Sequence, residues 1–326
     1  MMMRDDLKAA NARKAKKESK RPCERHLQGI LPVNKDVGLT SHDVVQRVRR
    51  IFGIRQVGHA GTLDPVASGV LVVLVGSATR IAQYLQEDDK EYHLTLYLGR
   101  ETDTQDITGT TIGEADPSGV TLQELESAID RYRGSFLQVP PAYSAVKRGG
   151  QPLYRLARQG QTVKADPRKV TIYSIEMDGW DPPRASLKVQ CSKGTYMRTL
   201  CHDIGRDLEV FGCMESLVRV RSGAFHIDDT IELDKLRSGT DPEKWLRNAA
   251  SGLSFPEFEP EDADLAGLLQ GRPVSWSGDQ LEGMVSVVRN GCLVALVSVG
   301  ESEGRMVIEP RRILKPAKEL LNKNYK

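Results

Sequence analysis

Apolar side chains follow two different spacings along this chain. They recur three and four residues apart over 42–52 and 196–208, which predicts two amphipathic helices. Ser41 is expected to cap the first of these helices. A capping box formed by Thr121 and Glu124 predicts the start of another helix.

Other apolar runs indicate strands. Residues 92–98 alternate between apolar and polar positions, as a strand with one buried face does. The continuous apolar run over 70–75 predicts a buried strand. Further strands are expected over 170–177, 186–191 and 217–225. Short apolar runs separated by glycines then predict a small β domain, with strands over 285–288, 293–299 and 306–308.

Composition divides the chain into segments of different character. With 326 residues, 39% of them hydrophobic, it can form two domains with buried cores. Residues 1–25 contain nine Lys or Arg and four Asp or Glu but few bulky apolar groups, which predicts a disordered basic tail. This tail either attracts phosphates nonspecifically or is only a solvated extension. A stretch rich in proline and acidic residues, 251–264, separates the expected domains, 26–255 and 262–315.

Charge and cysteine usage limit the function classes. The residues after the tail are slightly acidic overall, so nucleic-acid binding would need locally clustered cations. Five scattered cysteines without a C-x-x-C pair indicate reduced thiols rather than a disulfide framework or a zinc site. No apolar run reaches membrane-spanning length, and the N-terminus has no apolar signal-peptide core. We therefore expect a cytoplasmic protein without a bound metal.

A glycine-rich loop with one carboxylate precedes the continuous apolar strand. It reads Gly58-His59-Ala60-Gly61-Thr62-Leu63-Asp64-Pro65. Pro65 restricts Asp64 to extended geometry, and the glycines allow close approach by a partner. On residue types alone, this could be an ordinary turn in which Asp64 caps a backbone amide. The triplet Cys201-His202-Asp203 is not a nucleophilic triad, because consecutive helix positions point in different directions.

Four ordered motifs resemble the TruB family of tRNA pseudouridine synthases. The loop and the following strand read G-H-x-G-x-L-D-P-x-A-x-G-x-L, which resembles the family's catalytic motif. Residues 98–106 match its L-G-x-x-T-D-T-x-D, and residues 192–199 match its S-K-G-T-Y-x-R-T. Residues 138–168 resemble its RNA-binding thumb segment. The resemblance covers about residues 27–228.

Two stretches depart from the family pattern. The family's D-K-P-x-G-x-x-S is only partly kept over 34–41, where Lys35, Gly38 and Ser41 match but Asn34 and Asp36 do not. Its usual L-R-R is Leu217-Val218-Arg219 here, so one arginine is absent.

The resemblance implies a fold and a reaction. The implied fold is α+β: a pseudouridine-synthase fold with a central mixed, mainly antiparallel sheet flanked by helices, plus a small PUA-like β domain. The implied reaction breaks the N-glycosidic bond of a uridine in RNA, turns the base and rejoins it through carbon. Nothing is oxidised and no group moves to another molecule, so no cofactor is required. The implied partner is tRNA, modified at uridine 55 of its T-arm, without a membrane or an obligatory protein partner and with the enzyme as a monomer.

The resemblance also implies residue roles. Asp64 matches the nucleophile, and Arg198 is the cation expected to keep its carboxylate charged in a desolvated site. Tyr196 is expected to transfer a proton and to wall the pocket. The residues implied to bind the base are Tyr92, His59 and Leu217, with Asp106 and Lys35 as positioning residues. His59 is expected to fill the space that the base leaves when it flips out of its stack.

The expected thumb segment combines proline, glycine, aromatic and basic residues. Cations can bind phosphates and aromatic rings can stack on bases, so this composition suits a mobile segment that clasps RNA. The expected RNA-binding residues are Lys147, Arg148, Arg155 and Arg158. A surface loop with a short helix is the alternative interpretation.

Three other function classes are considered. A noncatalytic RNA-binding protein would not need Asp64, Tyr196 and Arg198 together. A guide-RNA-dependent synthase of the dyskerin type shares the aspartate loop but lacks this style of thumb. A glycosidase would usually need a second carboxylic acid near Asp64, and no such pair is evident in the sequence.

Overall fold

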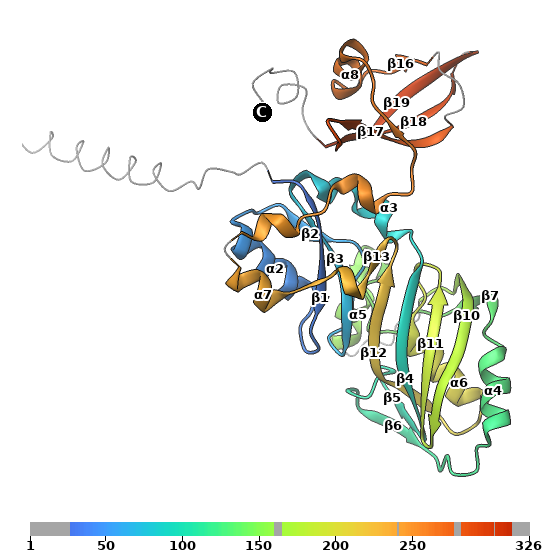
Figure 1. The fold of residues 1–326 in the computed structure, drawn as a ribbon. Helices are drawn as coiled ribbons and strands as arrows, with labels where there is room; N and C mark the ends of the chain where they lie inside the picture. Colours follow the sequence, from blue (N-terminus) through green and yellow to red (C-terminus); the bar gives the residue numbers. More distant parts are fainter. Residues whose placement is uncertain (1–26, 160–164, 240, 277–281, 303, 315–326) are drawn as a thin grey trace, which may run out of the picture.

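The fold, taken from a computed structural model, is described for residues 27–159, 165–239, 241–276, 282–302 and 304–314 (Figure 1). The expected basic tail, 1–25, lies outside the described residues. Two sheets organise the rest of the chain, and helices cover their faces (Figure 1). Among the described helices, none is long and apolar enough to cross a membrane.

The larger sheet has ten strands. Eight of them follow the order β14-β1-β3-β12-β4-β11-β10-β7, while β2 pairs with β3 and β13 pairs with β12. Among the described strand pairs of this sheet, only β1–β14 and β3–β12 are parallel. The strands are β1 (Gly29–Lys35), β2 (Val57–His59), β3 (Ala67–Val75), β4 (Lys90–Leu98), β7 (Gly134–Gln138), β10 (Arg168–Asp181), β11 (Arg184–Cys191), β12 (Gly212–Ser222), β13 (Phe225–His226) and β14 (Ile231–Glu232). The predicted mixed, mainly antiparallel sheet is confirmed.

Helices flank this sheet in two groups. In Figure 1, α4 and α6 lie beside the β10–β11–β4 half, whereas α2 and α7 lie beside β1. The α-helices are α2 (Ser41–Phe52), α3 (Ala82–Gln86), α4 (Leu122–Asp130), α5 (Leu153–Arg158), α6 (Met197–Asp207), α7 (Leu233–Ser238) and α8 (Asp262–Leu269). The 3₁₀ turns are η1 (Gly76–Ile81), η2 (Ile227–Asp229), η3 (Pro242–Trp245) and η4 (Ala249–Gly252). Two hairpins complete the larger unit: β5 (Arg100–Thr102) with β6 (Thr111–Glu114), and β8 (Lys147–Arg148) with β9 (Gln151–Pro152).

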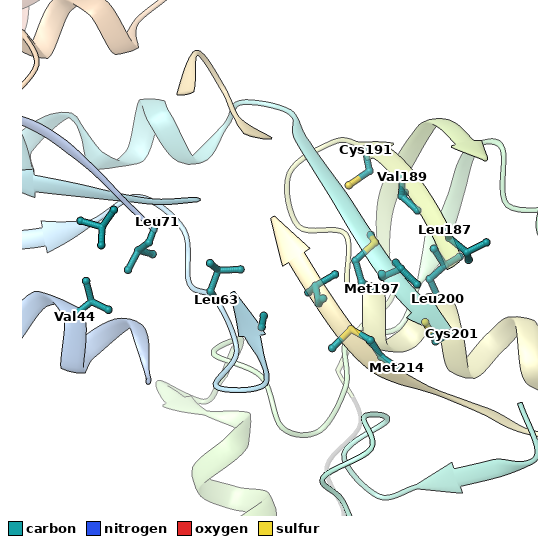
Figure 2. Close-up of a cluster of buried hydrophobic side chains, with 14 of the residues drawn as sticks. Val44, Leu63, Leu71, Leu187, Val189, Cys191, Met197, Leu200, Cys201 and Met214 are labelled. Atoms are coloured by element: carbon teal, nitrogen blue, oxygen red, sulfur yellow. The ribbon is translucent and has the colours of Figure 1, made fainter. Parts of the chain in front are cut away.

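The main core lies between the sheet and these helices. The apolar stripe of α6 places Met197, Leu200 and Cys201 against Leu187 and neighbouring residues of β11 (Figure 2). The side chains of Met197, Leu200 and Cys201 are buried, as the spacing predicts. The start of α6 is therefore held against the centre of the sheet.

The start of α2 differs from the expectation. Thr40, not Ser41, is the N-cap, and it forms a capping box with Asp43. Ser41 is instead buried, and its hydroxyl bonds to the backbone of Leu63. The prediction considered only local contacts, whereas the serine hydroxyl forms hydrogen bonds with a residue 22 positions away in the sequence.

The predicted strand over 217–225 is also revised. The chain forms β12, which begins earlier and ends at Ser222, and then turns into β13. Gly223 makes the turn with φ +57°, and a Cβ atom there would lie 2.3 Å from a carboxylate oxygen of Asp88. A side chain at this position would be strained, and the Asp88 side chain would have to move.

The second sheet follows the order β15-β17-β18-β19-β16. Its strands are β15 (Glu257–Phe258), β16 (Val274–Ser275), β17 (Gly283–Arg289), β18 (Cys292–Ser302) and β19 (Arg305–Ile313). The strand β15 pairs with β17 and lies inside the stretch 251–264, which was expected to be a linker. The second sheet thus begins before residue 262.

A shared apolar cluster joins the two sheets. Val70, Val72 and Leu74 of β3 belong to this cluster, whereas the alternate residues of β3 face the main core. Leu293 and Leu296 of β18 are fully buried in the same cluster. The continuous apolar run of β3 is therefore buried on both faces, and the second sheet contributes to covering one of them.

Candidate active site

The loop that carries Asp64 is held from two sides. The Ser41 hydroxyl donates to the Leu63 carbonyl at 3.1 Å and accepts from the Leu63 N–H at 2.9 Å. On the other side, the buried guanidinium of Arg219 donates to three backbone carbonyls, those of Val70 at 2.7 Å, Gly61 at 3.2 Å and Thr62 at 3.4 Å. These contacts fix the backbone before Asp64 and after it.

Arg219 also explains one glycine of the motif. Gly69 has φ +99°, and a Cβ atom at this position would lie 2.3 Å from the carbonyl oxygen of Arg219. The two backbones are neighbours because β3 and β12 pair in parallel here. Only glycine allows both the conformation and this close approach.

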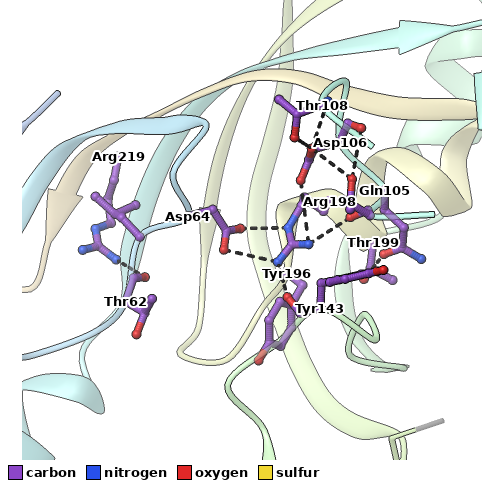
Figure 3. Close-up of polar contacts among 12 residues, drawn as sticks. Thr62, Asp64, Gln105, Asp106, Thr108, Tyr143, Tyr196, Arg198, Thr199 and Arg219 are labelled. Carbon is purple, nitrogen blue, oxygen red and sulfur yellow. Dashed lines mark hydrogen bonds and ion pairs between the residues drawn. The ribbon is translucent and has the colours of Figure 1, made fainter. Parts of the chain in front are cut away.

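Arg198 faces Asp64 across the site (Figure 3). Its Nε lies 2.8 Å from Asp64 Oδ2, and its Nη2 lies 3.2 Å from Asp64 Oδ1. The arginine side chain is 4% exposed and the aspartate side chain 34% exposed. A bidentate pair of this kind orients the carboxylate while leaving part of it accessible.

The rest of the guanidinium is satisfied by two loops. Nη1 donates to the Thr104 carbonyl at 2.9 Å, and Nη2 also donates to the Tyr143 carbonyl at 3.0 Å. Asp106 Oδ2 lies 3.8 Å from Nη1, within ion-pair distance. The other oxygen of Asp106 accepts from the Thr108 N–H at 3.1 Å and from hydroxyls of Thr104 and Thr108. The structure thus places Asp106 beside Arg198, where the sequence predicted a positioning residue.

Tyr196 is the N-cap residue of α6, and its ring lies near Arg198 (Figure 3). Burial raises the pKa of its hydroxyl, which therefore remains protonated at neutral pH. Its backbone N–H donates to Gln138 Oε1 at 2.8 Å, and its carbonyl accepts from Gln138 Nε2 at 3.1 Å. Arg198 lies off the apolar stripe of the helix and is nevertheless buried, because loops cover it.

The residues predicted to bind the base lie on strands of the large sheet. Tyr92 of β4 is half-buried, opposite Arg219 of β12, and burial raises the pKa of its hydroxyl. His59 ends β2, and burial lowers the pKa of its imidazole, which favours the neutral form. Leu217 is 6% exposed and packs in the main core next to Leu94 of β4.

Lys35 is fully buried at the end of β1. Its ammonium donates to the carbonyls of Asp36 at 2.9 Å and Leu39 at 2.8 Å. Burial lowers its pKa to about 8. The lysine thus fixes the turn before α2, which in turn supplies Ser41 to the Asp64 loop.

The expected RNA-binding residues lie in the β8–β9 hairpin and α5. Arg155 is exposed on α5. The side chains of Lys147, Arg148 and Arg158 lie outside the described parts of the structure. Within the described ranges, no group of His, Cys, Asp and Glu could hold a metal ion.

Sequence reasoning missed two residues that shape the site. Arg219 was noted only as part of a changed motif, although it lies two residues after Leu217 and thus on the same buried strand face. The alternation of buried positions along this strand could therefore have indicated that Arg219 is buried. Gln138 gave no comparable signal, since its contact with Tyr196 spans 58 residues.

Comparisons with known proteins agree with the motifs. A family model described as "TruB family pseudouridylate synthase (N terminal domain)" matches residues 49–197. A second, "tRNA pseudouridylate synthase B C-terminal domain", matches residues 198–249.

Relatives and solved structures extend this likeness. A tRNA pseudouridine synthase B of Syntrophotalea carbinolica is 47% identical over 64% of this chain and 69% of its own length. One of Caldanaerobacter subterraneus is 37% identical over 88% of this chain and 99% of its own length. The Cbf5-Nop10-Gar1 complex contains a chain with a TM-score of 0.69 and 26% identity, covering 92% of this chain and 89% of that one. The chain therefore belongs to the TruB family of pseudouridylate synthases, which are isomerases, as the motifs predicted.

Proposed function

We propose that this protein converts uridine 55 in the T-arm of tRNA to pseudouridine, with Asp64 as the nucleophile. The observation that carries this proposal is the bidentate pair between Asp64 and the buried Arg198. The named relatives support tRNA as the substrate, since both are tRNA pseudouridine synthases B.

The reaction balances without a cofactor. The bond between C1′ of the ribose and N1 of uracil breaks, and a bond between C1′ and C5 forms. The hydrogen on C5 leaves as a proton, and N1 gains a proton. The enzyme has to supply a nucleophile, a path for protons and a pocket in which the base can turn.

Asp64 supplies the nucleophile. Its carboxylate is one-third exposed, so one side can meet the substrate while Arg198 holds the other side. A positioned carboxylate can form a covalent intermediate that divides one difficult step into two easier ones. The same geometry serves attack on the uracil ring or on the sugar carbon.

Tyr196 and the base-binding residues complete the proposed pocket. The hydroxyl of Tyr196 is protonated at neutral pH and can donate or relay a proton. Tyr92 stacks on the uracil, Leu217 bounds the pocket, and His59 occupies the gap in the RNA left by the flipped base. Asp106 and Lys35 act by positioning Arg198 and the turn before α2.

RNA contacts outside the pocket are assigned to two regions. The catalytic domain spans 26–255, and its insertion 138–168 clasps the RNA through Lys147, Arg148, Arg155 and Arg158. The second β domain, over 262–315, acts as a PUA-like RNA-binding module. We propose that the enzyme works in the cytoplasm as a monomer without a partner protein, unlike the Cbf5 of the solved complex, which assembles with Nop10 and Gar1.

Chemical mapping of pseudouridine on an unmodified tRNA transcript tests this function. The purified full chain, alone, should modify position 55 and should leave a transcript with cytidine at that position unmodified. Modification at a different uridine would contradict the assigned position. A requirement for a guide RNA or added proteins would instead favour the guide-dependent class.

A further inference from the structure

Gln138 makes a two-point contact with the backbone of Tyr196. It is the last residue of β7 and is 2% exposed. Its Oε1 accepts from the Tyr196 N–H at 2.8 Å, and its Nε2 donates to the Tyr196 carbonyl at 3.1 Å. A backbone N–H can only donate and a carbonyl can only accept, so the pairing fixes the orientation of the amide.

This contact holds the N-cap residue of α6 by its backbone. The N-cap position of α6 holds tyrosine, whose side chain does not cap the helix, whereas Ser, Thr, Asp and Asn are the usual capping residues. The Tyr196 carbonyl also accepts from the Leu200 N–H at 3.0 Å, the first hydrogen bond of the helix. Gln138 therefore binds the backbone group at which the helical ladder begins.

Two neighbouring contacts tie the same segment to α6. Arg198 Nη2 donates to the Tyr143 carbonyl at 3.0 Å, and Thr199 Oγ1 lies 3.5 Å from the Val139 carbonyl. The Thr199 hydroxyl also donates to Gln105 Oε1 at 2.9 Å (Figure 3). The start of the insertion thus contacts the N-terminal end of α6 at Tyr196, Arg198 and Thr199.

We propose that Gln138 is a positioning residue for catalysis, which holds Tyr196 and Arg198 in register with Asp64. The proposal rests on the function proposed above, because it takes these three residues as the reacting group. Gln138 is buried, so we expect it to affect the chemical step and not the binding of RNA. An apolar side chain could fill the same space, but it would leave the Tyr196 backbone without this clamp.

The main test is a Gln138→Met variant, which keeps the length of the side chain and removes both hydrogen bonds. Its single-turnover rate at saturating tRNA transcript should fall about 10-fold to 100-fold, in the range expected for a small misplacement of reacting groups. Its Kd for the transcript should stay within about 2-fold of the wild-type value, because phosphate contacts set the affinity. Gln123→Met, at an exposed position of α4, is the matched control and should change neither quantity.

A double-mutant cycle separates positioning from general destabilisation. In an Arg198→Lys background, where the guanidinium is already lost, Gln138→Met should cost less than about 3-fold in rate. Full additivity of the two losses would overturn the proposal. So would a wild-type single-turnover rate in folded Gln138→Met, or a loss confined to RNA affinity.

A second variant covers the case in which Gln138→Met does not fold at the assay temperature. Gln138→Asn keeps the amide on a side chain that is one methylene shorter, so the amide no longer reaches the Tyr196 backbone. We expect the same loss of single-turnover rate as for Gln138→Met. Normal rates in this variant would count against the proposal. If the wild-type chain itself formed no pseudouridine at position 55, the proposed function would fail; if only the Gln138 variants were unaffected, this inference alone would fail.

Discussion

Arg198 meets Asp64 edge-on, with its Nε and Nη2 atoms 2.8 and 3.2 Å from the two carboxylate oxygens. The same guanidinium donates to the carbonyls of Thr104 and Tyr143, so three segments of the chain converge on one buried side chain. A planar fork with fixed donors can satisfy all of these acceptors at once, whereas an ammonium group cannot.

Arg198→Lys should therefore lower the single-turnover rate by about 100-fold or more, in line with the removal of a preorganised charged contact. Its affinity for tRNA should change little. Rates at saturating RNA and equilibrium binding measure the two effects. Arg206→Lys, about two turns later on α6 and paired with Glu101, is the control and should remain close to wild type. A near-normal rate in Arg198→Lys would remove the bidentate role.

Asp106→Asn should cause a smaller loss of the same kind. The carboxylate of Asp106 lies 3.8 Å from Arg198 Nη1, and asparagine keeps an acceptor for Thr104 and Thr108 but loses the charge. The double variant with Arg198→Lys should cost little more than Arg198→Lys alone, because coupled residues are not additive. Single-turnover rates of the three variants decide this, and independent effects would show that Asp106 does not act through Arg198.

Arg219→Met should destabilise the fold and slow catalysis. The substitution leaves the carbonyls of Gly61, Thr62 and Val70 without their buried donor, which should cost about 2–3 kcal/mol in the free energy of unfolding. Denaturant unfolding measures this loss. Arg221 lies on the same strand as Arg219, and Arg221→Met removes a partly exposed ion pair with Glu91 of β4, so this control should cost less than about 1 kcal/mol. Equal stabilities of the two variants would contradict the scaffold role of Arg219.

Removal of the second sheet should lower stability as well as RNA affinity. Every matched catalytic motif lies before residue 229, so the sequence alone predicts chemistry without this domain. The structure adds that Leu293 and Leu296 are buried in the same apolar cluster as Ile81 and Leu85, each with about 1.5–3 kcal/mol of hydrophobic stabilisation. A chain ending at residue 255 should therefore retain activity on a saturating T-arm hairpin at low temperature, with a reduced thermal midpoint. An unchanged midpoint would show that the shared cluster does not stabilise the catalytic domain.

Local patterns predicted much of this fold. The apolar stripe of α6, the Thr121–Glu124 capping box and the alternating strands follow from spacing, because these elements depend on neighbours in the sequence. Ser41 shows the limit of such rules: its residue type suits a cap, but the Leu63 backbone takes its hydroxyl and Thr40 caps the helix. Thr40 and Ser41 are both residue types that can cap a helix, and the structure shows that Thr40 does so.

Residues of the candidate site could be predicted where they lie within a recognisable sequence motif. Motifs brought Asp64, Arg198 and Asp106 to attention, and the structure places them together. The contact of Gln138 with Tyr196 and the apolar cluster shared by the two sheets depend on how distant segments pack, so no local pattern revealed them.

The central claim is that Asp64 is the nucleophile, and Asp64→Asn tests it most directly. The measurement is tritium release from tRNA labelled at C5 of uridine, with RNA affinity determined in parallel. Asp178→Asn, which removes a surface partner of Lys188, is the control and should behave as wild type. We predict no detectable release by Asp64→Asn, with tRNA affinity within a few-fold of wild type. Turnover at even a few per cent of the wild-type rate, in a preparation verified by mass spectrometry, would contradict the assignment.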